Sequence, residues 1–396
     1  MTKLFIEDLP LKDKKVLVRV DFNVPLDQDL NVTDPTRIEA ALPTIRYILD
    51  QGGIPILMSH FGRPKAEYLP ELSLAPCARV LSKLLNRTVT MAPDCIGEEV
   101  EDLVDALKPG SLLLLENLRF HRAEKHPEEG LEFAQALAKL GDLYVNDAFG
   151  CCHRAHTSIT ALPALFPDRA AAGYLLKKEI ESLDKLLKEP ERPLVAIIGG
   201  AKISSKIGVL KALCERVDTL LIGGGMAYTF LKAQNIGIGN SLCENEHLET
   251  AKEIMAKAKK LLLPVDLVVV QEFSEDAPSK IVATIPPGYE GVDIGPKTVE
   301  LFCSEIRKAK SILWNGPVGV FEFEPFAKGT FALARAVAES GAQSVVGGGD
   351  SIAALKKSGM EKKISHISTG GGATLEYIEL GTLPGIEALT TAKLIH

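Results

Sequence analysis

The chain has 396 residues and a formal net charge of −7, from 45 Lys and Arg against 52 Asp and Glu. At roughly 100–200 residues a domain, this length favours two domains, with three as the alternative. Hydrophobic residues make up 46% and charged residues 24% of the chain, which is typical of globular proteins and excludes disordered and fibrous classes. The acidic balance disfavours nucleic acid or an anionic membrane as the main partner, because both attract basic surfaces.

Arginine and glycine are unevenly distributed along the chain. Ten of the 14 arginines lie within the first 169 residues, whereas 24 of the 33 glycines lie beyond residue 190. Guanidinium groups bind phosphate in paired hydrogen bonds, and glycine exposes backbone N–H groups that bind phosphate at helix N-termini. The front half is expected to bind an anion through arginine and the back half through backbone. Chance variation between two domains is the alternative.

The cysteines and the N-terminus indicate a cytoplasmic protein. Seven cysteines form no C-x-x-C pair, which disfavours a disulfide framework or a structural zinc site. The N-terminus is acidic where a signal peptide needs an apolar core, and the apolar run at 261–270 is too short to span a bilayer. Cys151 and Cys152 are expected to be buried small hydrophobes, with redox sensitivity as the alternative.

Short apolar runs alternate with longer helix-like stretches along the whole chain. The runs lie at 16–20, 54–58, 112–115, 143–145, 195–198, 219–222, 267–270, 311–314, 344–346 and 364–367. Runs this short with little alternation of polarity are typical of strands buried on both faces of a parallel sheet. With the intervening helices they predict an α/β fold of two doubly wound, Rossmann-like parallel-sheet lobes.

The segment 170–193 is the candidate boundary between the lobes. Residues 175–187 have amphipathic helical spacing, and Pro190 and Pro193 follow where a helix would stop. This pattern favours a connecting helix with a stiff exit. An ordinary surface helix and loop would give the same local pattern.

Polar residues follow the ends of four predicted strands in the front half. They are Asp21 and Asn23, then Ser59 to Pro64, then Glu116 to Phe120, and then Asn146 to Gly150 with His153, Arg154 and His156 behind them. In open α/β sheets the residues just beyond the carboxyl ends of strands line the ligand crevice. Three of the four strand ends have an arginine close behind, which favours an anionic ligand. His153 and His156 are expected to hydrogen-bond beside that anion rather than to bind zinc.

Arg37 is expected to reach the same anion from a helix. Asp34, Pro35 and Arg37 are typical of an N-cap, a first helical position and a first turn. A basic side chain there opposes the helix dipole, so an anionic ligand explains Arg37 better than helix stability does.

Glycine clusters follow four predicted strands of the back half and precede helical patterns. They are 199–200, 223–225, 347–349 and 370–372. Their shared position favours a nucleotide cradle, although tight strand-to-helix turns also select glycine. The P-loop pattern fails because Ser205 and Ile207 stand at required positions, and the dinucleotide fingerprint fails because Tyr228 replaces its third glycine.

Two lysines and one aspartate complete this predicted cradle. Lys202 and Lys206 are four residues apart, so in the first turns of a helix they would share a face and reach one polyphosphate. Asp350 directly follows a glycine triplet, where it would bind Mg²⁺ through oxygen, act as a helix N-cap, or do both.

Taken together, these segments resemble the phosphoglycerate kinase family over nearly the whole chain. The motifs that carry the resemblance are residues 19–25, 59–64, 116–120, 153–156, 199–202, 314–322, 347–350 and 368–373. The resemblance implies reversible phosphoryl transfer from 1,3-bisphosphoglycerate to MgADP, which gives 3-phosphoglycerate and MgATP in glycolysis. It also implies a monomer with Mg²⁺ and ATP or ADP, and with small-molecule partners only. Cys151 and Cys152 stand where the family usually has Thr-Ala-like residues.

The resemblance also assigns regions and residues. Residues 1–170 would bind phosphoglycerate, 171–193 would form the connecting helix and hinge, 194–382 would bind nucleotide across a cleft, and 383–396 would return to the first lobe. The implied substrate-binding residues are Asp21, Phe22, Asn23, Arg37, His60, Phe61, Gly62, Arg63, Arg119 and Arg154. The implied nucleotide-binding residues are Lys206, Glu322, Gly347, Gly348, Gly349 and Asp350, with Asp350 on the metal, and the implied catalytic residues are Arg37, Lys202 and Lys206.

The residues present are consistent with this chemistry. A carboxylate acceptor is already ionised at neutral pH, so catalysis needs alignment and charge neutralisation rather than a general base. A non-catalytic phosphate or nucleotide sensor with the same cradle is the rival class. A dehydrogenase is disfavoured by the missing glycine fingerprint.

Overall fold

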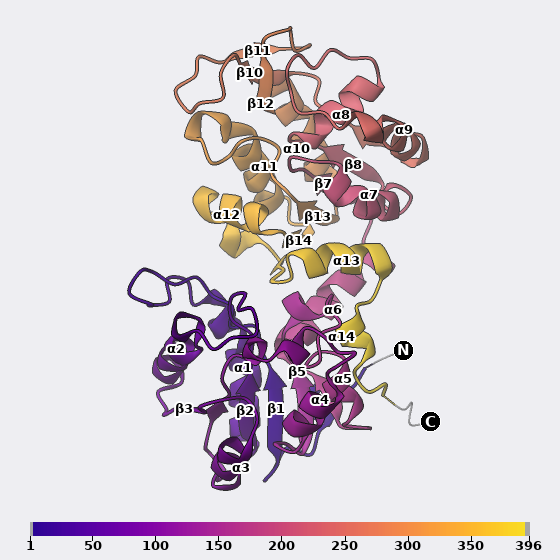
Figure 1. Ribbon diagram of the computed structural model, residues 1–396. Coiled ribbons are helices and arrows are strands. Elements are labelled where there is room, and N and C mark those ends of the chain that lie inside the picture. The colour runs from indigo at the N-terminus through magenta and orange to yellow at the C-terminus, as the bar shows by residue number, and fades with distance from the viewer. Residues whose placement is uncertain (1–2, 393–396) are drawn as a thin grey trace. The chain divides into compact units, whose positions relative to one another are not determined.

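The computed structural model describes residues 3–392 of the protein and divides the chain into two compact units (Figure 1). Unit 1 comprises Met1–Ile180 with Thr382–His396, and unit 2 comprises Glu181–Gly381. Within residues 3–392, no helix is both long enough and apolar enough to cross a membrane. Each unit is built on its own parallel sheet, so the predicted α/β class with two doubly wound lobes is confirmed.

Unit 1 contains a parallel sheet in the order β3-β4-β2-β1-β5-β6. Its strands are β1 Lys15–Arg19, β2 Ile54–Met58, β3 Thr90–Met91, β4 Leu113–Leu114, β5 Leu143–Asn146 and β6 Ala170–Ala172. The main strands are buried almost throughout, as their unbroken apolar sequences predict. After β4 the chain crosses to the other side of β1, and right-handed crossovers then place helices on both faces of the sheet.

The described part of unit 1 contains α14 Pro384–Glu387 near the C-terminus and six further α-helices along residues 36–188, the last of which crosses into unit 2. The six are α1 Thr36–Asp50, α2 Ala75–Leu85, α3 Glu98–Asp105, α4 Leu131–Ala138, α5 Ala161–Ala164 and α6 Tyr174–Lys188. α1 shows how they pack, because Ile38, Ile45 and Ile48 recur at helical spacing and are fully buried in the core of unit 1.

Unit 2 repeats the plan with a parallel sheet in the order β15-β14-β13-β7-β8-β9. Its strands are β7 Leu194–Ile198, β8 Thr219–Ile222, β9 Leu261–Leu262, β13 Ser311–Asn315, β14 Gln343–Gly347 and β15 His366–Ile367. Its helices are α7 Ile207–Cys214, α8 Met226–Ala233, α9 Leu248–Lys257, α10 Pro296–Lys308, α11 Lys328–Glu339, α12 Gly349–Ser358 and α13 Gly372–Leu380. The order reverses between β7 and β13, and in open α/β sheets ligands bind at such a reversal.

One predicted strand lies in a different sheet from the one expected. β10 Leu267–Val270 pairs antiparallel with β11 Lys280–Val282 and β12 Glu290–Ile294 instead of joining the parallel sheet. The apolar run correctly predicted a strand. Short loops, rather than a helix, connect β10 to β11 and β11 to β12. Short connections join antiparallel strands, whereas parallel neighbours need a longer crossover.

The segment 170–193 begins as part of unit 1. Ala170–Ala172 forms β6 and pairs with β5, so the first residues expected in the connector belong to the sheet. α6 follows and covers the predicted amphipathic helix at 175–187. The two units divide inside α6, after Ile180.

The chain returns to unit 1 near its C-terminus through α14 Pro384–Glu387. The backbone N–H of Gly385 donates to the carbonyl of Cys152, and that of Thr390 donates to the carbonyl of Ala170. The N–H of Leu4 in turn donates to the Thr390 carbonyl, so both ends of the described chain lie beside β6. Of the predicted segment 383–396, residues 393–396 lie outside the described residues.

Candidate active site

Strand register brings the predicted residues of unit 1 to one edge of the sheet. Arg19 at the end of β1 is aligned with Met58 of β2 on one side and with Asn146 of β5 on the other. Because the three strands are parallel, the chain leaves all of them at the same edge. Asp21, His60 and the segment after β5 therefore meet there.

Arg37 reaches this edge from the first turn of α1. Its Nη1 atom donates to Oδ2 of Asp21 at 2.7 Å, and its side chain remains 42% exposed. The helix begins one residue later than predicted, with Pro35 in the cap position rather than Asp34. Asp34 still accepts a hydrogen bond from the N–H of Thr36 at 3.0 Å. It therefore provides an acceptor for a backbone N–H group at the start of α1, although it lies outside the helix.

Asn23, Gly62 and Arg119 form a second chain of contacts at the same edge. The Oδ1 atom of Asn23 accepts the N–H of Gly62 at 2.9 Å, and the carbonyl of Gly62 accepts Nη1 of Arg119 at 2.7 Å. Gly62 has φ +57°, a conformation that side-chain-bearing residues seldom adopt. Arg119 is only 5% exposed, and its buried Nε has no protein partner. A buried donor without a partner is costly, so this atom favours an anionic ligand here.

Two histidines at this edge are held neutral. Burial, and then the charges of Arg19 and Arg119, keep the pKa of His60 well below its usual value. Burial, followed by the charges of the same two arginines, lowers the pKa of His156 to about 3. Both rings are therefore hydrogen-bonding groups rather than cations at neutral pH. This edge of unit 1 therefore combines guanidinium charge with uncharged imidazole.

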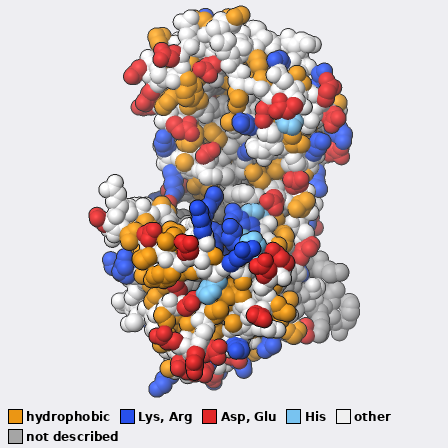
Figure 2. Space-filling model, viewed as in Figure 1, with side chains coloured by type: hydrophobic (Ala, Val, Ile, Leu, Met, Phe, Trp, Pro, Cys, Tyr) orange, Lys and Arg blue, Asp and Glu red, His pale blue; other side chains and the backbone are white. Residues whose placement is uncertain are grey.

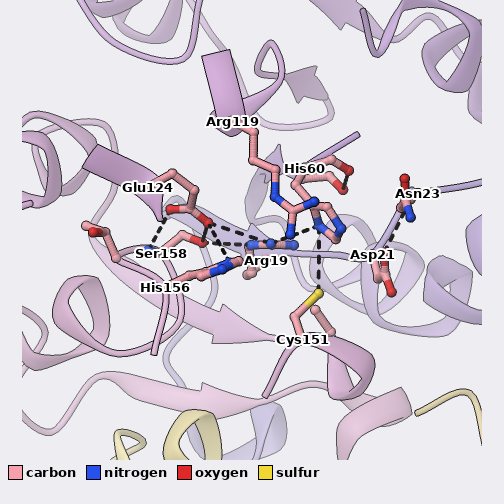
Figure 3. Close-up of polar contacts among 12 residues, drawn as sticks. Arg19, Asp21, Asn23, His60, Arg119, Glu124, Cys151, His156 and Ser158 are labelled. Atoms are coloured by element: carbon pink, nitrogen blue, oxygen red, sulfur yellow. Dashed lines mark hydrogen bonds and ion pairs between the residues drawn. The ribbon is translucent and has the colours of Figure 1, made fainter. Parts of the chain in front are cut away.

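A buried ion network adjoins these histidines, and sequence analysis did not identify it (Figure 3). Arg19 and Glu124 are both fully buried, with Nη2 of Arg19 3.8 Å from Oε1 of Glu124. Ser158 joins them, since its Oγ accepts Nε of Arg19 at 2.8 Å and donates to Oε1 of Glu124 at 2.7 Å. Arg19 sits inside an apolar strand motif, which is itself a signal, because a charge on a buried strand needs a partner.

The remaining predicted arginines are exposed. Arg63 is exposed, and Arg154 is exposed with its Nε donating to Nε2 of His153 at 3.2 Å. The charge of Arg154, after burial, lowers the pKa of Arg119, which places these two cations near each other. Figure 2 shows Lys and Arg side chains gathered with His side chains over unit 1.

A cavity of about 300 Å³ adjoins Arg119 in unit 1. Its lining residues are Pro64, Lys65, Ala66, Arg119, His121, Arg122, Lys125 and His126. Every charged group of the lining is basic, so the cavity extends the positively charged character of the edge.

Two predicted substrate contacts have their side chains in the core instead. Phe22 is fully buried in the hydrophobic core of unit 1, and Phe61 is 5% exposed in the same cluster. Large apolar side chains after a strand pack inward when they continue its buried face. Only the backbone of these two residues is available to a ligand.

Unit 2 aligns its predicted residues at its own sheet edge. Asn315 of β13 is in register with Ile198 of β7 and with Gly347 of β14. The glycine loops that follow these strands are therefore neighbours at the point where the strand order reverses. This is the position at which doubly wound sheets bind ligands.

Lys206 is held inside this edge, whereas Lys202 is exposed. Nζ of Lys206 donates to Oδ1 of Asn315, and burial lowers the pKa of Lys206 to about 8 against the opposing influence of Asp350. The two lysines do not share a regular helical face as predicted. A 3₁₀ turn, Ser204–Lys206, separates Lys202 from α7, which begins at Ile207.

The glycine clusters serve two different purposes. A Cβ on Gly199 would lie 2.1 Å from the Pro317 carbonyl, and one on Gly224 would lie 2.7 Å from the Gly200 carbonyl. These glycines allow loops to pack against each other. A Cβ on Gly349 would meet nothing within 4 Å. Space for a ligand at the backbone therefore exists at 347–349, where α12 begins with Gly348 as its cap.

Asp350 and Glu322 are both exposed residues of unit 2, and Asp350 directly follows this glycine triplet. Asp350 lies in the first turn of α12 and is not the N-cap, which is Gly348. A single exposed carboxylate beside a glycine-rich helix start fits Mg²⁺, which proteins commonly bind through one or two carboxylates and substrate phosphates.

Among the described residues of unit 1, Asp21, His60 and Cys151 also bring metal-ligating atoms together. Arg37 and Arg19 already contact the first two, so this group does not suit a cation.

The fold and the two edges define a class, a two-unit α/β phosphotransferase. Residues 6–380 match the family model for phosphoglycerate kinase. The phosphoglycerate kinase of Moorella thermoacetica is 56% identical over 98% of this chain and 100% of the relative, and that of Chlorobaculum tepidum is 54% identical over the same shares. The structure of phosphoglycerate kinase from Coxiella burnetii aligns with a TM-score of 0.89 at 42% identity and covers 98% of both chains. The chain belongs to the phosphoglycerate kinase family, as the sequence motifs predicted, and is a kinase.

Proposed function

We propose that the protein transfers a phosphoryl group reversibly from the acyl phosphate of 1,3-bisphosphoglycerate to MgADP, giving 3-phosphoglycerate and MgATP in glycolysis. The observation that carries this proposal is the unit 1 edge, where guanidinium groups meet neutral histidines and the orphaned Nε of Arg119. Such an edge suits a small substrate with carboxylate and phosphate groups, since guanidinium forks bind both.

The proposed roles follow the two edges. In unit 1, Asp21 and Asn23 orient the glycerate, the backbone at Phe22, Phe61 and Gly62 lines it, and His60, Arg37, Arg63, Arg119 and Arg154 bind its anionic groups. In unit 2, Lys206, Glu322, Gly347, Gly348, Gly349 and Asp350 bind the nucleotide. When bound, Mg²⁺ supplies charge neutralisation on the nucleotide phosphates, and Asp350 would hold it.

Catalysis in this scheme depends on position and charge. The acceptor for ATP-dependent phosphorylation is an ionised carboxylate, so no residue has to remove a proton. The transferring group spreads negative charge over its oxygens in a metaphosphate-like transition state. Arg37, Lys202 and Lys206 are the groups that would neutralise this charge.

The proposal extends to the organisation of the chain. Residues 1–170 would bind phosphoglycerate, with 383–396 packing on that domain. Residues 194–382 would bind nucleotide, and 171–193 would form the connecting helix and hinge. The enzyme would act as a cytoplasmic monomer without nucleic-acid or membrane partners. The net charge of −7 supports the absence of those partners.

A coupled assay tests the proposed function. Purified full-length protein is mixed with 3-phosphoglycerate and MgATP, and the 1,3-bisphosphoglycerate formed is reduced by a second enzyme with loss of NADH absorbance. Turnover that requires both substrates is expected. Binding of the ligands without turnover would instead show a phosphate or nucleotide sensor and would contradict the proposal.

A further inference from the structure

Arg19 contacts the ring of His60 at the edge of unit 1 (Figure 3). Nη2 of Arg19 lies 3.2 Å from Nδ1 of His60, and both residues are buried, with exposed fractions of 0% and 6%. A guanidinium group has only donors and keeps its charge at any pH that a folded protein tolerates. Nδ1 of His60 must therefore be the acceptor in this contact and cannot carry a proton.

The surrounding network prevents the guanidinium of Arg19 from turning away. Its Nε donates to Oγ of Ser158 at 2.8 Å, and its Nη1 donates to the carbonyl of Val20. Glu124 supplies the opposing charge from 3.8 Å and is itself held by the N–H and hydroxyl of Ser158, at 2.9 and 2.7 Å. Burial raises the pKa of Glu124, and the charge of Arg19 opposes that change.

The other groups that face His60 act in the same direction or are neutral. Arg119 and Arg154 are cations and His156 is uncharged, so a proton added to His60 would meet net repulsion. Sγ of Cys151 lies 3.8 Å from the same Nδ1 atom, and burial raises the pKa of that thiol. A neutral thiol is at most a weak donor to Nδ1. Among the described residues, Asp21 has a carboxylate oxygen within 4.8 Å of a ring nitrogen of His60, and that carboxylate is paired with Arg37.

We propose that Arg19 is a positioning residue that fixes His60 as a neutral imidazole with its proton on Nε2, so that His60 is a constant hydrogen-bond donor to the anionic substrate. The role in substrate binding rests on the proposed function, whereas the tautomer does not. A neutral donor keeps the same strength as the pH crosses the range in which an ordinary histidine loses its charge. Substrate affinity then does not depend on the ionisation of His60.

Nuclear magnetic resonance of the ligand-free full-length protein tests the tautomer directly. The eight histidines are labelled with ¹⁵N, and His60 is assigned by the signal lost in His60→Gln. The expected result is an unprotonated Nδ1 and a protonated Nε2 that do not change between pH 5.5 and 8. A proton on Nδ1, or a titration within this range, would overturn the proposal whatever the activity of the enzyme.

A paired substitution tests the part played by Arg19. Arg19→Met with Glu124→Gln removes both buried charges together, because removing one alone leaves the other uncompensated. His60 is then expected to mix tautomers and to titrate, and KM for 3-phosphoglycerate at pH 8 is expected to rise about tenfold, the loss of one well-placed hydrogen bond. That KM is expected to fall again on acidification, while kcat changes less.

Cys151→Ala is the matched control, since it removes the other group that contacts Nδ1. The tautomer and its insensitivity to pH are expected to persist in this variant. Loss of the Nε2–H form in Cys151→Ala, or its persistence in the paired variant, would assign the effect to another group and overturn the role of Arg19. Should the paired variant fail to fold, the measurement on the wild-type protein still decides the tautomer.

Discussion

Arg37 and Asp21 form a 2.7 Å ion pair that ties the first turn of α1 to the residue after β1. Only one of the five guanidinium donors of Arg37 is used in this contact, and its side chain stays 42% exposed while that of Asp21 is 15% exposed. The ion pair therefore orients the guanidinium group of Arg37 toward this edge of the sheet and leaves its other donors available to a ligand. A positive side chain in this first turn opposes the helix dipole, so helix stability does not account for it.

Arg37→Ala is expected to lower kcat by about 10³-fold, within the range known for arginines that neutralise a transferring phosphoryl group. The substrate KM should change less, because other guanidinium groups remain. Steady-state kinetics in the coupled assay measures both. Arg46→Ala, at an arginine of the same helix that donates to the carbonyl of Leu84, is the control and should keep wild-type rates. Turnover near the wild-type value in Arg37→Ala would remove Arg37 from the catalytic residues.

Nucleotide binding is expected to take up a proton at Lys206. Burial lowers the pKa of Lys206 to about 8, so in the free enzyme its ammonium group loses its proton as the pH rises through that value. Phosphate groups favour the charged form. At pH 8.5, MgATP binding should therefore take up about 0.7 proton per site. Calorimetric titration in two buffers with different ionisation enthalpies measures this number.

Lys206→Arg is the control for this proton uptake, because a guanidinium group stays charged throughout the range. Its binding should show little or no proton uptake at pH 8.5. Equal uptake in the wild-type protein and in Lys206→Arg would assign the proton to another group.

The residues at the two sheet edges were predictable because they are tied to strand ends. Parallel strands deliver whatever follows them to one edge, so Asp21, His60 and Asp350 could be placed from short apolar runs alone. The same rule did not place the Phe22 side chain, which packs into the core. Whether a residue after a strand turns toward ligand or core depends on neighbouring elements, and a local pattern does not contain that information.

The network behind the edge could not be predicted from local pattern. Arg19 is more than 100 residues away from both Glu124 and Ser158 along the chain. Glu124 and Ser158 are themselves more than 30 residues apart. Arg19 lies in one of the motifs that indicated the family, but its partners Glu124 and Ser158 can be identified only from the three-dimensional structure. The glycine clusters show the same limit, since Gly224 and Gly349 look alike in sequence and only the structure separates loop packing from open space.

Two glycine substitutions should separate these roles. Gly224→Ala forces a side chain into φ +69° and places a Cβ 2.7 Å from the Gly200 carbonyl, so it should destabilise the protein by about 1–3 kcal/mol. Gly349→Ala meets nothing within 4 Å and adds helix propensity at the start of α12, so stability should not fall. Its methyl group would instead crowd the phosphate, raising KM for MgATP about tenfold.

Urea unfolding and steady-state kinetics on both variants test this contrast. Gly349→Ala with wild-type KM for MgATP would exclude close approach of the nucleotide at this backbone. An unchanged free energy of unfolding in Gly224→Ala would show that the loop relaxes and that packing does not require glycine there.

Asp147 is expected to make the stability of the protein depend on pH. It is 1% exposed, its Oδ1 accepts the N–H groups of Leu175 and Leu176 at 2.9 and 3.3 Å, and its Oδ2 is buried without a partner. Burial raises the pKa of Asp147 to about 7 in the folded protein, above the value near 4 of an unfolded chain. Between these values the folded state binds the extra proton, so stability contributed by Asp147 is present at low pH and is lost as pH rises toward and through 7.

Asp147→Asn keeps an oxygen for the two N–H groups and cannot ionise, so it removes this loss. The wild-type free energy of unfolding should fall by about 2–3 kcal/mol more than that of the variant between pH 5 and pH 8. Urea unfolding at both pH values measures the difference, and Asp105→Asn, at an exposed carboxylate paired with Lys15, is the matched control. A parallel pH dependence in wild type and Asp147→Asn would mean that Asp147 is ionised in the folded protein, because an ionised carboxylate contributes no proton to lose over this range.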